Sequence, residues 1–363
     1  MASVGIKDVA ARAGVSVATV SRVLNAHASV SPAARERVLA AVDALGYRPN
    51  ALARSLRTDQ TRTLGLVISD VLNPYFTALA RSVEEEARAL GYSIIFGNAD
   101  ERPELQDHHV RTLLDRRIDG LLVSPADGGS PLVLDAARAG TPMVFVDRWI
   151  PGLDVPVVRA DGGSAVRDLV AHLHRLGHRR LAIIAGPAAT TTGSERVTAF
   201  RDALAEYGLE LPDAYIGQGD FQAASGRRAT ERFLALPEPP EVVFAADNLM
   251  ALGALDAIRA RGLRVPHDIA LAAFDDIPWF VHTDPPITAI AQPTDELGRA
   301  AVRALTDLIE GRTPESVTLP ARLVVRRSCG EDPGAGPAPE TGTTSRTGTT
   351  SRTGTGTTRR SDA

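Results

Sequence analysis

Short apolar runs alternate with helical segments from Leu64 to Asp276, and this alternation occurs twice. The first half contains LGLVI, YSIIFGN, DGLLVS and MVFVD, with helices between them. The second half begins with a helix over about 164–176 and continues with RRLAIIAG, a helix over about 194–207, YIG, EVVFAAD and IALAAFDD. Strands that are apolar along their length and joined by helices predict parallel sheets covered on both faces. The sequence therefore predicts an α/β core of two lobes, each a doubly wound parallel sheet.

Polar residues directly follow the predicted strands. Pairs of them come after MVFV, VVFAA and LAAF: Asp147 and Arg148, Asp247 and Asn248, Asp275 and Asp276. Two-lobed α/β proteins bind small ligands between their lobes, at the carboxyl ends of strands. We therefore expect a small-molecule site where these polar residues meet.

The net charge of −4 hides a basic N-terminal segment. Residues 1–60 carry eight Lys or Arg against four Asp or Glu, whereas residues 61–330 carry 28 Arg against 36 Asp or Glu. A basic segment next to an acidic body favours contact between that segment and an anionic polymer such as nucleic acid. An exposed polar face explains the same charge equally well, so the motifs must decide.

The basic segment predicts three short helices. Apolar positions recur at helical spacing over 6–13 and 20–24, and Gly14 between them tolerates a left-handed backbone. Ser16 is placed to cap the second helix, and Ser31-Pro32 begins a third. This is the pattern of a helix-turn-helix DNA-binding unit, although a small helical bundle without a DNA partner also fits it.

The second helix supplies the candidate residues for reading DNA. Arg22 can bind guanine through two hydrogen bonds in the major groove, while Val17 and Ala18 offer apolar contact to a thymine methyl group. The hydroxyl and amide side chains nearby suit phosphates or bases. The candidate set in this segment is Ser16, Val17, Ala18, Thr19, Ser21, Arg22 and Asn25.

Residues 49–60 are predicted to form a hinge helix and linker. A helix of about two turns capped by Asn50 is too short to be stable alone in water. A dimer on DNA would stabilise it, because Arg54 and Arg57 would meet phosphates and Leu56 of each chain would insert at a base step in the minor groove. A plain linker is the alternative. The candidate DNA-binding residues here are Asn50, Ala53, Arg54, Leu56 and Arg57.

Three stretches, IKDVAARAGVSVATVSRVLN, VSPAARERVLAAVDALGYRPN and ALARSLR, closely resemble the DNA-binding head and hinge of LacI/GalR-family repressors. NPYF, GLLVSP, VDR, LGHRRLAIIAGP, GDF, FAADNLMALGA, GLRVPHDIALAAFDDIPW and LVVRRSC extend the resemblance to the periplasmic-binding-protein-like core of that family, over about residues 5–329. It implies that Val17, Ala18 and Arg22 read the major groove. It also implies that Leu56 intercalates at the centre of a near-palindromic operator, bound by a homodimer.

The same resemblance implies an effector site. The residues that it assigns are Tyr75, Phe76, Asp147, Arg196, Phe221, Asn248 and Asp275, with Trp279 nearby. Aromatic faces with carboxylates, an amide and one arginine suit a polyhydroxylated ring such as a sugar, since each hydroxyl needs a partner once it leaves water. The arginine of purine-binding members falls at Thr190, which argues against a purine. Taken singly, each residue fits a strand-end turn or helix cap equally well.

Signals for catalysis, metals or cofactors are weak. No GxSxG elbow occurs, and Asp275 and Asp276 are adjacent rather than facing each other. On a helix, His172 points away from the face shared by His174 and His178, which argues against a metal site. The stretch beginning at Asp161, DGGS, lacks the GK[ST] ending of a phosphate loop. We therefore expect no enzyme, no cofactor and no metal.

The remaining sequence features concern the cellular compartment of the protein and its C-terminal residues. No run approaches the ~18 apolar residues of a membrane helix, and charges interrupt the N-terminal stretch where a secretory apolar core would lie. The single cysteine, Cys329, is expected near the end of the last strand as an inert or partly exposed thiol, and excludes an internal disulfide framework. We expect a cytoplasmic protein without membrane contact. The repetitive 331–363 tail is predicted to be disordered, and it has no leucine heptads for a tetramer.

These patterns combine into one organisation: a helix-turn-helix domain over 1–48, a hinge over 49–60, a two-lobed effector-binding and dimerisation core over 61–330, and the tail. The function predicted is a homodimeric transcriptional regulator, a repressor of operator DNA under the control of a small effector, with a sugar favoured. The alternative is a two-lobed solute-binding protein without a regulatory role, which would need export and would have no use for the basic head.

Overall fold

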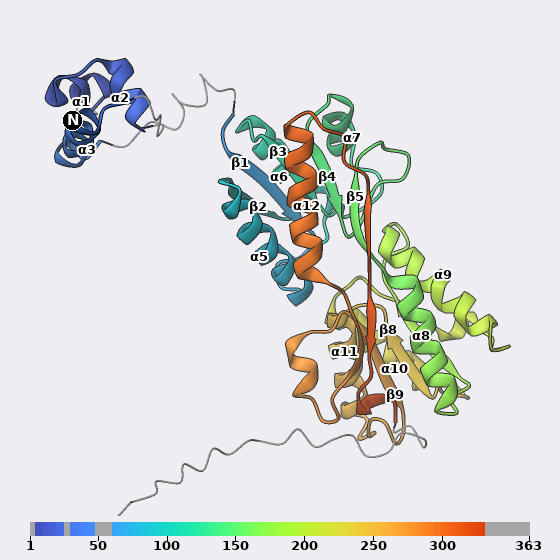
Figure 1. The fold of residues 1–363 in the computed structure, drawn as a ribbon. Coiled ribbons are helices and arrows are strands. Elements are labelled where there is room, and N and C mark those ends of the chain that lie inside the picture. Colours follow the sequence, from blue (N-terminus) through green and yellow to red (C-terminus); the bar gives the residue numbers. More distant parts are fainter. Residues whose placement is uncertain (1–3, 25–29, 48–59, 331–363) are drawn as a thin grey trace, which may run out of the picture. The chain divides into compact units, whose positions relative to one another are not determined.

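The computed structural model describes residues 4–24, 30–47 and 60–330 of the chain (Figure 1). The predicted hinge, except Gln60, and the predicted tail lie outside the described residues. The first two described segments form the head, which consists of α1 (Ile6–Ala13), α2 (Val17–Leu24) and α3 (Pro32–Leu45).

The three head helices end and begin as the sequence predicts. Gly14 ends α1 in the left-handed region at φ 63°, and Gly46 ends α3 at φ 58°. The Ser31 hydroxyl accepts a hydrogen bond from the backbone N–H of Ala34 at the start of α3. The apolar faces of the three helices share one small core around Val9, Val20 and Val38, whose side chains are fully buried.

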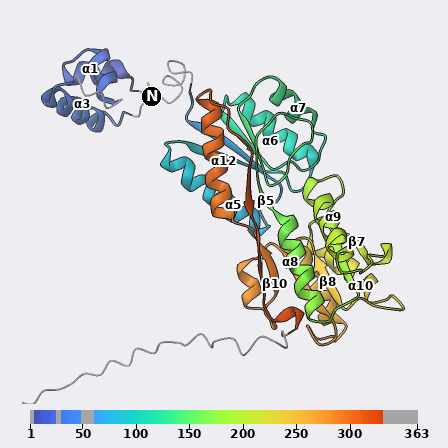
Figure 2. The same ribbon diagram turned by 45° about the vertical axis from the view of Figure 1, so that its right-hand side comes forward.

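The N-lobe is a six-stranded parallel sheet in the order β11-β5-β4-β3-β1-β2. Helices α5 and α12 cover one face, and α6 and α7 cover the other (Figure 2). Its elements are β1 (Thr63–Ile68), α5 (Pro74–Ala89), β2 (Ser93–Asn98), α6 (Pro103–Asp115), β3 (Gly120–Val123), α7 (Pro131–Arg138), β4 (Met143–Val146), β5 (Val157–Asp161), α12 (Thr294–Ile309) and β11 (Val317–Pro320).

The C-lobe is a second six-stranded sheet in the order β12-β10-β9-β8-β6-β7, parallel except for the β10–β12 pair. Helices α8 and α9 pack together, as do α10 and α11 (Figure 1). Its helices and strands are α8 (Gly162–Arg175), β6 (Leu181–Ala185), α9 (Thr191–Ala205), β7 (Ile216–Gln218), α10 (Ala223–Phe233), β8 (Val242–Ala245), α11 (Asn248–Ala260), β9 (Ala270–Phe274), β10 (Thr288–Ala291) and β12 (Arg322–Val324). Short 3₁₀ turns are η1 (Asp213–Tyr215), η2 (Pro278–Val281) and η3 (Arg327–Cys329).

The chain passes between the lobes three times, from β5 to α8, from β10 to α12 and from β11 to β12. The sequence predicted two halves that follow one another, whereas α12 and β11 return to the N-lobe. The fold class is confirmed, with a helical head and two parallel-sheet lobes. The predicted helices over about 164–176 and 194–207 correspond to α8 and α9, each of which begins two or three residues earlier.

Two glycines fix the position of α11, whose first turn carries site residues. A Cβ atom at Gly253 of α11 would lie 1.8 Å from the carbonyl oxygen of Ala223, and one at Gly226 of α10 would lie 2.1 Å from that of Met250. Only glycine allows the two helix backbones to approach so closely. The N-terminus of α11 is thereby held at the edge of the sheet that faces the N-lobe.

Cys329 lies near the end of the last strand, as expected, but its side chain is not exposed. It lies in η3, beyond the last strand, and its side chain is fully buried beside the carbonyl oxygen of Leu271. Burial raises the pKa of the Cys329 thiol to about 11. Of the two expectations, the inert thiol agrees with this setting and the partly exposed thiol does not.

Candidate functional site

Helix α2 presents the residues that were predicted to read DNA. Val17, Ala18 and Arg22 are exposed, while Val20 and Val23 on the opposite face are buried in the head core. Ser16 caps the helix, since its hydroxyl accepts a hydrogen bond from the backbone N–H of Thr19. Thr19 and Ser21 are half-buried at the edge of this face. Val17, Ala18 and Arg22 thus share an exposed face of α2 in the described part of the head.

Six of the predicted DNA-binding residues have no structural description. Asn25, Asn50, Ala53, Arg54, Leu56 and Arg57 lie outside the described residues.

The core brings most of the predicted effector residues together between the lobes, where they line a cavity of about 10 Å³. Those that line it are Tyr75, Phe76, Asp147, Arg196, Phe221 and Asp275. Asn248 is fully buried and donates a hydrogen bond to Asn73, which lines the same cavity. We call these seven residues, with Asn73, Arg148, Thr192, Asp247 and Gln292, the inter-lobe cluster.

Trp279 is the exception among the predicted effector residues. The η2 turn places its side chain toward solvent, with 58% of its surface exposed. It lines a different cavity of about 370 Å³, which also touches Tyr75 and Asp275. The structure therefore places Trp279 near the inter-lobe cluster but outside it.

Three residues of the cluster hold unusual backbone conformations at the ends of strands. Asp147, Phe221 and Asp275 have φ values of 68°, 62° and 67°, and they lie just beyond β4, β7 and β9. Aspartate tolerates this left-handed region, but a bulky residue such as phenylalanine rarely adopts it. Such strain costs about 1–3 kcal/mol per residue and is concentrated at functional sites.

Hydrogen bonds across the cluster tie the two lobes together. The Asn73 side chain donates to a carboxylate oxygen of Asp247 at 2.9 Å and accepts from Asn248 at 2.8 Å. Beside them, the Gln222 amide donates to Asp70 at 3.1 Å. Asn73 and Asp70 belong to the N-lobe and their partners to the C-lobe, so these bonds form only in this arrangement of the lobes.

Arginines lie against the aromatic rings of the cluster. The guanidinium of Arg148 is 4.6 Å from the ring centroid of Phe221 and 5.7 Å from that of Phe76. Arg196 lies 3.6 Å from the ring centroid of Phe274 and donates to the carbonyl oxygen of Ala246. These contacts fix both guanidinium groups in the low-dielectric space between the lobes.

Buried carboxylates give the cluster its electrostatic character. Burial raises the pKa of Asp247 to about 7, and the neighbouring Asp275 charge adds to this rise. Burial also raises the pKa of Asp275 to about 6, although Arg196 opposes it. The Tyr75 hydroxyl donates to Asp147 at 3.0 Å, and burial together with that carboxylate raises the pKa of Tyr75 well above its ordinary value.

Three buried polar atoms around the cluster have no hydrogen-bond partner among the described residues. They are Thr192 Oγ1, Arg148 Nε and Asn248 Oδ1. A buried polar atom without a partner is costly, and in native proteins it usually marks a place where a ligand or water binds. Hydroxyl groups can satisfy all three atoms, because a hydroxyl both donates and accepts.

The effector residues implied by the family resemblance omitted five members of the cluster: Asn73, Arg148, Thr192, Asp247 and Gln292. Arg148 and Asp247 were nevertheless among the polar residues after predicted strands that we expected to meet at the site. Asn73 and Thr192 carried no signal beyond the start of a helix. Their contacts come from residues far away in the sequence, which no local pattern specifies.

The described residues show no group of His, Cys, Asp or Glu that could hold a metal ion. His174 stacks on Tyr207, and His178 hydrogen-bonds to the carbonyl oxygen of Cys329. Within the described ranges, no helix is both long and apolar enough to cross a membrane.

Comparison with known proteins decides the family. Residues 5–50 match the family described as bacterial regulatory proteins, lacI family, and residues 170–329 match the periplasmic binding protein-like domain. The HTH-type transcriptional repressor CytR of Escherichia coli (strain K12) is 36% identical over 311 residues, covering 85% of this chain and 90% of that protein. The chain belongs to the LacI family.

Solved structures of LacI-family proteins share this architecture. The lac repressor dimer bound to operator and the anti-inducer ONPF has a TM-score of 0.82 and 30% identity, covering 91% of this chain and 100% of that chain. The complex of the transcriptional regulator CelR with cellobiose has a TM-score of 0.67 and 35% identity, covering 90% of this chain and 99% of that chain. The chain is thus a DNA-binding transcriptional regulator with a small-molecule effector, and not an enzyme. The alternative of a solute-binding protein without a regulatory role does not hold.

Proposed function

We propose that this LacI-family chain represses transcription as a cytoplasmic homodimer on a near-palindromic operator, under the control of a sugar. The observation that carries the choice of effector is the inter-lobe cluster. In it, carboxylates and one amide lie beside aromatic rings, and three buried polar atoms have no hydrogen-bond partner among the residues that the structure describes. Transfer of a polyhydroxylated ring from water into a protein costs free energy unless each hydroxyl forms a hydrogen bond in the site.

Each group of the cluster has a role in this proposal. The carboxylates of Asp147 and Asp275 accept hydrogen bonds from sugar hydroxyls, and Arg196 and Asn248 contact the hydroxyl oxygens. The rings of Tyr75, Phe76 and Phe221 flank the apolar faces of the sugar. CelR, which is 35% identical to this chain, is solved in complex with cellobiose, and this supports a saccharide effector.

A purine effector is less compatible with the site. Where purine-binding members carry an arginine, this chain has Thr190. Its hydroxyl accepts a hydrogen bond from the backbone N–H of Gly193 and donates one to the carbonyl oxygen of Pro187. The side chain is therefore committed to the start of α9 and is 3% exposed.

The lobes provide the coupling between effector and operator. The bonds from Asn73 to Asp247 and Asn248 hold one relative arrangement of the lobes. A sugar that binds one arrangement of the lobes more tightly than another shifts the equilibrium toward the first arrangement. It can change operator affinity only by as much as its own affinity differs between the two arrangements. In this proposal the arrangement of the core (61–330) determines whether the hinge (49–60) forms paired helices on the operator.

The DNA-binding roles follow from the exposed face of α2. Arg22 binds a guanine edge, and Val17 and Ala18 make apolar base contacts. Ser16, Thr19 and Ser21 position the helix against phosphates. Two heads related by the twofold axis of a dimer read two half-sites, so the operator is nearly palindromic.

Binding of the purified full-length protein to a tiled library of genomic promoter fragments tests the proposal. The measurement is made at fixed salt, with and without a panel of mono- and disaccharides. We expect one near-palindromic site whose affinity changes with one sugar and falls steeply as salt is raised. Specific binding that is indifferent to every sugar would refute the effector class, and the absence of any specific site would refute the operator model.

A matched pair of variants assigns the response to the inter-lobe cluster. Arg196→Met removes a buried guanidinium of the cluster, whereas Arg201→Met removes an exposed one from the same helix. We expect the first variant to bind operator DNA without a sugar response and the second to respond like the parent protein. Equal responses from both variants would place the effector elsewhere.

A further inference from the structure

The described part of the core begins at Gln60, and the residues that follow it are bound to the start of another strand. The carboxylate of Asp119, directly before β3, accepts three hydrogen bonds from them. The backbone N–H and the hydroxyl of Thr61 donate to Oδ1 at 2.6 and 2.7 Å, and the backbone N–H of Arg62 donates to Oδ2 at 2.9 Å. We call Thr61, Arg62 and Asp119 the entry clamp.

The entry clamp holds an unusual backbone conformation. Arg62 has a φ of 52°, in the left-handed region that residues other than glycine rarely adopt and that persists only where the surroundings hold it. Its guanidinium lies 5.0 Å from the ring centroid of Tyr92, a residue of the N-lobe core. Its carbonyl oxygen accepts a hydrogen bond from the backbone N–H of Ser93 at 2.9 Å. The direction in which the chain enters β1 is therefore fixed on the N-lobe.

We infer that Asp119 is a positioning residue for operator binding, because it fixes on the N-lobe the residues through which the head is attached. Every residue of the head precedes residue 60, so its covalent attachment to the core passes through the entry clamp. If the clamp is lost, operator binding must also fix the backbone of Thr61 and Arg62, which costs conformational entropy. The inference rests on the proposed function, since it assigns a role in binding the operator.

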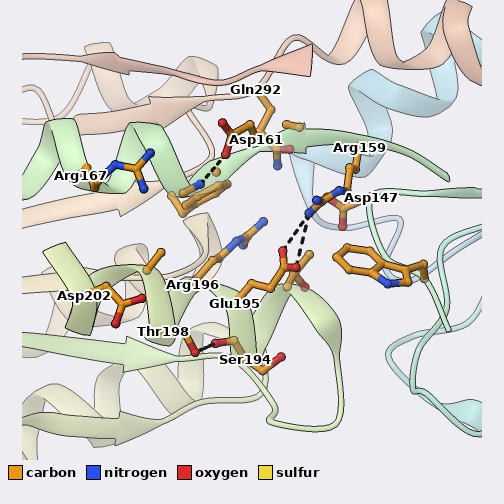
Figure 3. A pocket seen from close by; sticks show the side chains of 17 residues that line it. Asp147, Arg159, Asp161, Arg167, Ser194, Glu195, Arg196, Thr198, Asp202 and Gln292 are labelled. Atoms are coloured by element: carbon orange, nitrogen blue, oxygen red, sulfur yellow. Dashed lines mark hydrogen bonds and ion pairs between the residues drawn. The ribbon is translucent and has the colours of Figure 1, made fainter. Parts of the chain in front are cut away.

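Strand β1 connects the entry clamp to the contacts between the lobes (Figure 1). It pairs with β2 on one side and β3 on the other, and all but the first of its residues are buried. Asp70, just beyond its end, accepts a hydrogen bond from Gln222 of the C-lobe at 3.1 Å. In the same sheet, Arg159 of β5 pairs with Glu195 of α9 at 3.0 Å (Figure 3). A strand of about 20 Å that is paired on both sides moves with its sheet, so a rearrangement of the lobes displaces the clamp.

The C-lobe contains an equivalent clamp that does not border the head. Glu241, directly before β8, accepts hydrogen bonds from the backbone N–H groups of Arg179 and Arg180 at 2.6 and 3.2 Å. Both clamps join the starts of two neighbouring parallel strands, β1 and β3 in one lobe and β6 and β8 in the other. The chain reaches the second clamp from α8 of the same lobe. Stabilisation of a strand start is thus common to both clamps, and only the position of Asp119 gives it a role toward DNA.

Operator affinities of full-length variants test the inference. The probes are the promoter fragment that the parent protein binds most tightly in the tiled library and a scrambled fragment of equal length. Asp119→Ala should weaken binding to the promoter fragment at least about tenfold, because two more backbone residues must be fixed. Binding to the scrambled fragment, which depends on phosphate contacts, should change less than about twofold. Glu241→Ala also removes one carboxylate clamp and one negative charge, and both of its affinities should match those of the parent protein.

A conservative variant separates positioning from folding. Asp119→Asn keeps an oxygen that can accept both Thr61 bonds, so its promoter affinity should lie between those of Asp119→Ala and the parent protein. Urea midpoints from tryptophan fluorescence show which variants are folded under the assay conditions. If Asp119→Ala is unfolded, Asp119→Asn must itself bind the promoter fragment more weakly than the parent protein does.

Two results would overturn the role of Asp119 and leave the proposed function standing. One is an unchanged promoter affinity in the folded Asp119 variants, and the other is an equal loss in Asp119→Ala and Glu241→Ala. Failure of the parent protein to bind any promoter fragment specifically would overturn both the role and the proposed function.

Discussion

Removal of one partner of the buried Glu101–Arg148 ion pair should strongly destabilise the N-lobe. The Arg148 guanidinium donates two hydrogen bonds to the Glu101 carboxylate, at 2.7 and 2.8 Å. The two side chains are 4% and 13% exposed for Arg148 and Glu101 respectively. Burial alone would lower the pKa of Arg148, but the charge and hydrogen bonds of Glu101 outweigh burial and raise it. The Arg148 guanidinium stays charged, and Glu101 offsets the cost of burying that charge.

Glu101→Ala is the perturbation that removes this partner. Loss of one member of a buried ion pair costs about 3–5 kcal/mol, because the other charge stays buried and unpaired. Asp147, whose carboxylate lies 3.8 Å from Arg148 Nε, still offers partial compensation. We therefore expect a loss near the lower limit, about 3 kcal/mol in the free energy of unfolding of the N-lobe.

The two tryptophans allow the loss to be measured in one lobe. Trp149 lies in the N-lobe and Trp279 in the C-lobe, so Trp279→Phe leaves fluorescence that reports on the N-lobe alone. In this background, with a urea m-value of about 2 kcal/mol/M, Glu101→Ala should lower the midpoint by about 1.5 M. The double variant Glu101→Ala/Arg148→Met should recover most of this loss, since it leaves no buried charge unpaired.

An exposed pair in the same lobe is the control. Arg102 and Glu104 lie close by, but their side chains are 55% and 62% exposed. Glu104→Ala should leave the urea midpoint unchanged, because water screens such pairs. The reasoning would be refuted if Glu101→Ala left the midpoint in place, or if the control variant lost as much as Glu101→Ala.

Three further predictions concern the head, the buried carboxylates and the cysteine. Arg22→Ala should lose about 1–3 kcal/mol of discrimination at one base pair per half-site, measured on a set of operator variants, and an unchanged preference would exclude Arg22 from base reading. The free energy of unfolding should fall as pH rises from about 4 to about 7, because folded Asp247 and Asp275, with pKa values of about 7 and about 6, retain protons that the unfolded chain releases near pH 4. Urea midpoints measured across this pH range should vary less in Asp275→Asn, and an identical pH profile would contradict the assignment. The Cys329 thiol, buried and with its pKa raised to about 11, should react with a disulfide reagent only after unfolding, and rapid reaction of the native protein would show that the site opens.

Most of the strands that the sequence predicted are buried on both faces, although β2 and β7 are partly exposed. β3, β4, β6, β8 and β9 are buried at every position, so their residues form continuous apolar runs. The strands β5, β11 and β12 were not predicted, and most of their residues are half-buried or exposed. Short, partly exposed strands of this kind resemble loops in sequence, and only tertiary pairing reveals them.

The residues of the effector site that directly follow strands could be predicted from the sequence. The contacts between residues of different lobes could not. Asp147 and Asp275 follow apolar runs, so topology alone places them at the same edge of their sheets. Asn73 precedes a proline at the start of α5, which identifies it as a helix cap, and it does accept from the Tyr75 N–H. Its second role, contact with Asp247 and Asn248, joins positions 174 and 175 residues apart.

Backbone strain and unpaired polar atoms in the inter-lobe cluster together explain how a ligand can favour one relative arrangement of the two lobes. Phe221 keeps a left-handed backbone at a cost of about 1–3 kcal/mol, which the surrounding packing must sustain. Its ring is thereby fixed before any ligand binds, so binding does not incur the entropy cost of ordering it. A ligand that satisfies Thr192 Oγ1 and Asn248 Oδ1 removes the cost of two buried unpaired atoms only in the arrangement that brings them together. A ligand would thus stabilise one arrangement of the lobes by about 1–3 kcal/mol relative to the others. This free energy is as large as a typical allosteric coupling free energy, and it would change operator affinity by about 5- to 150-fold.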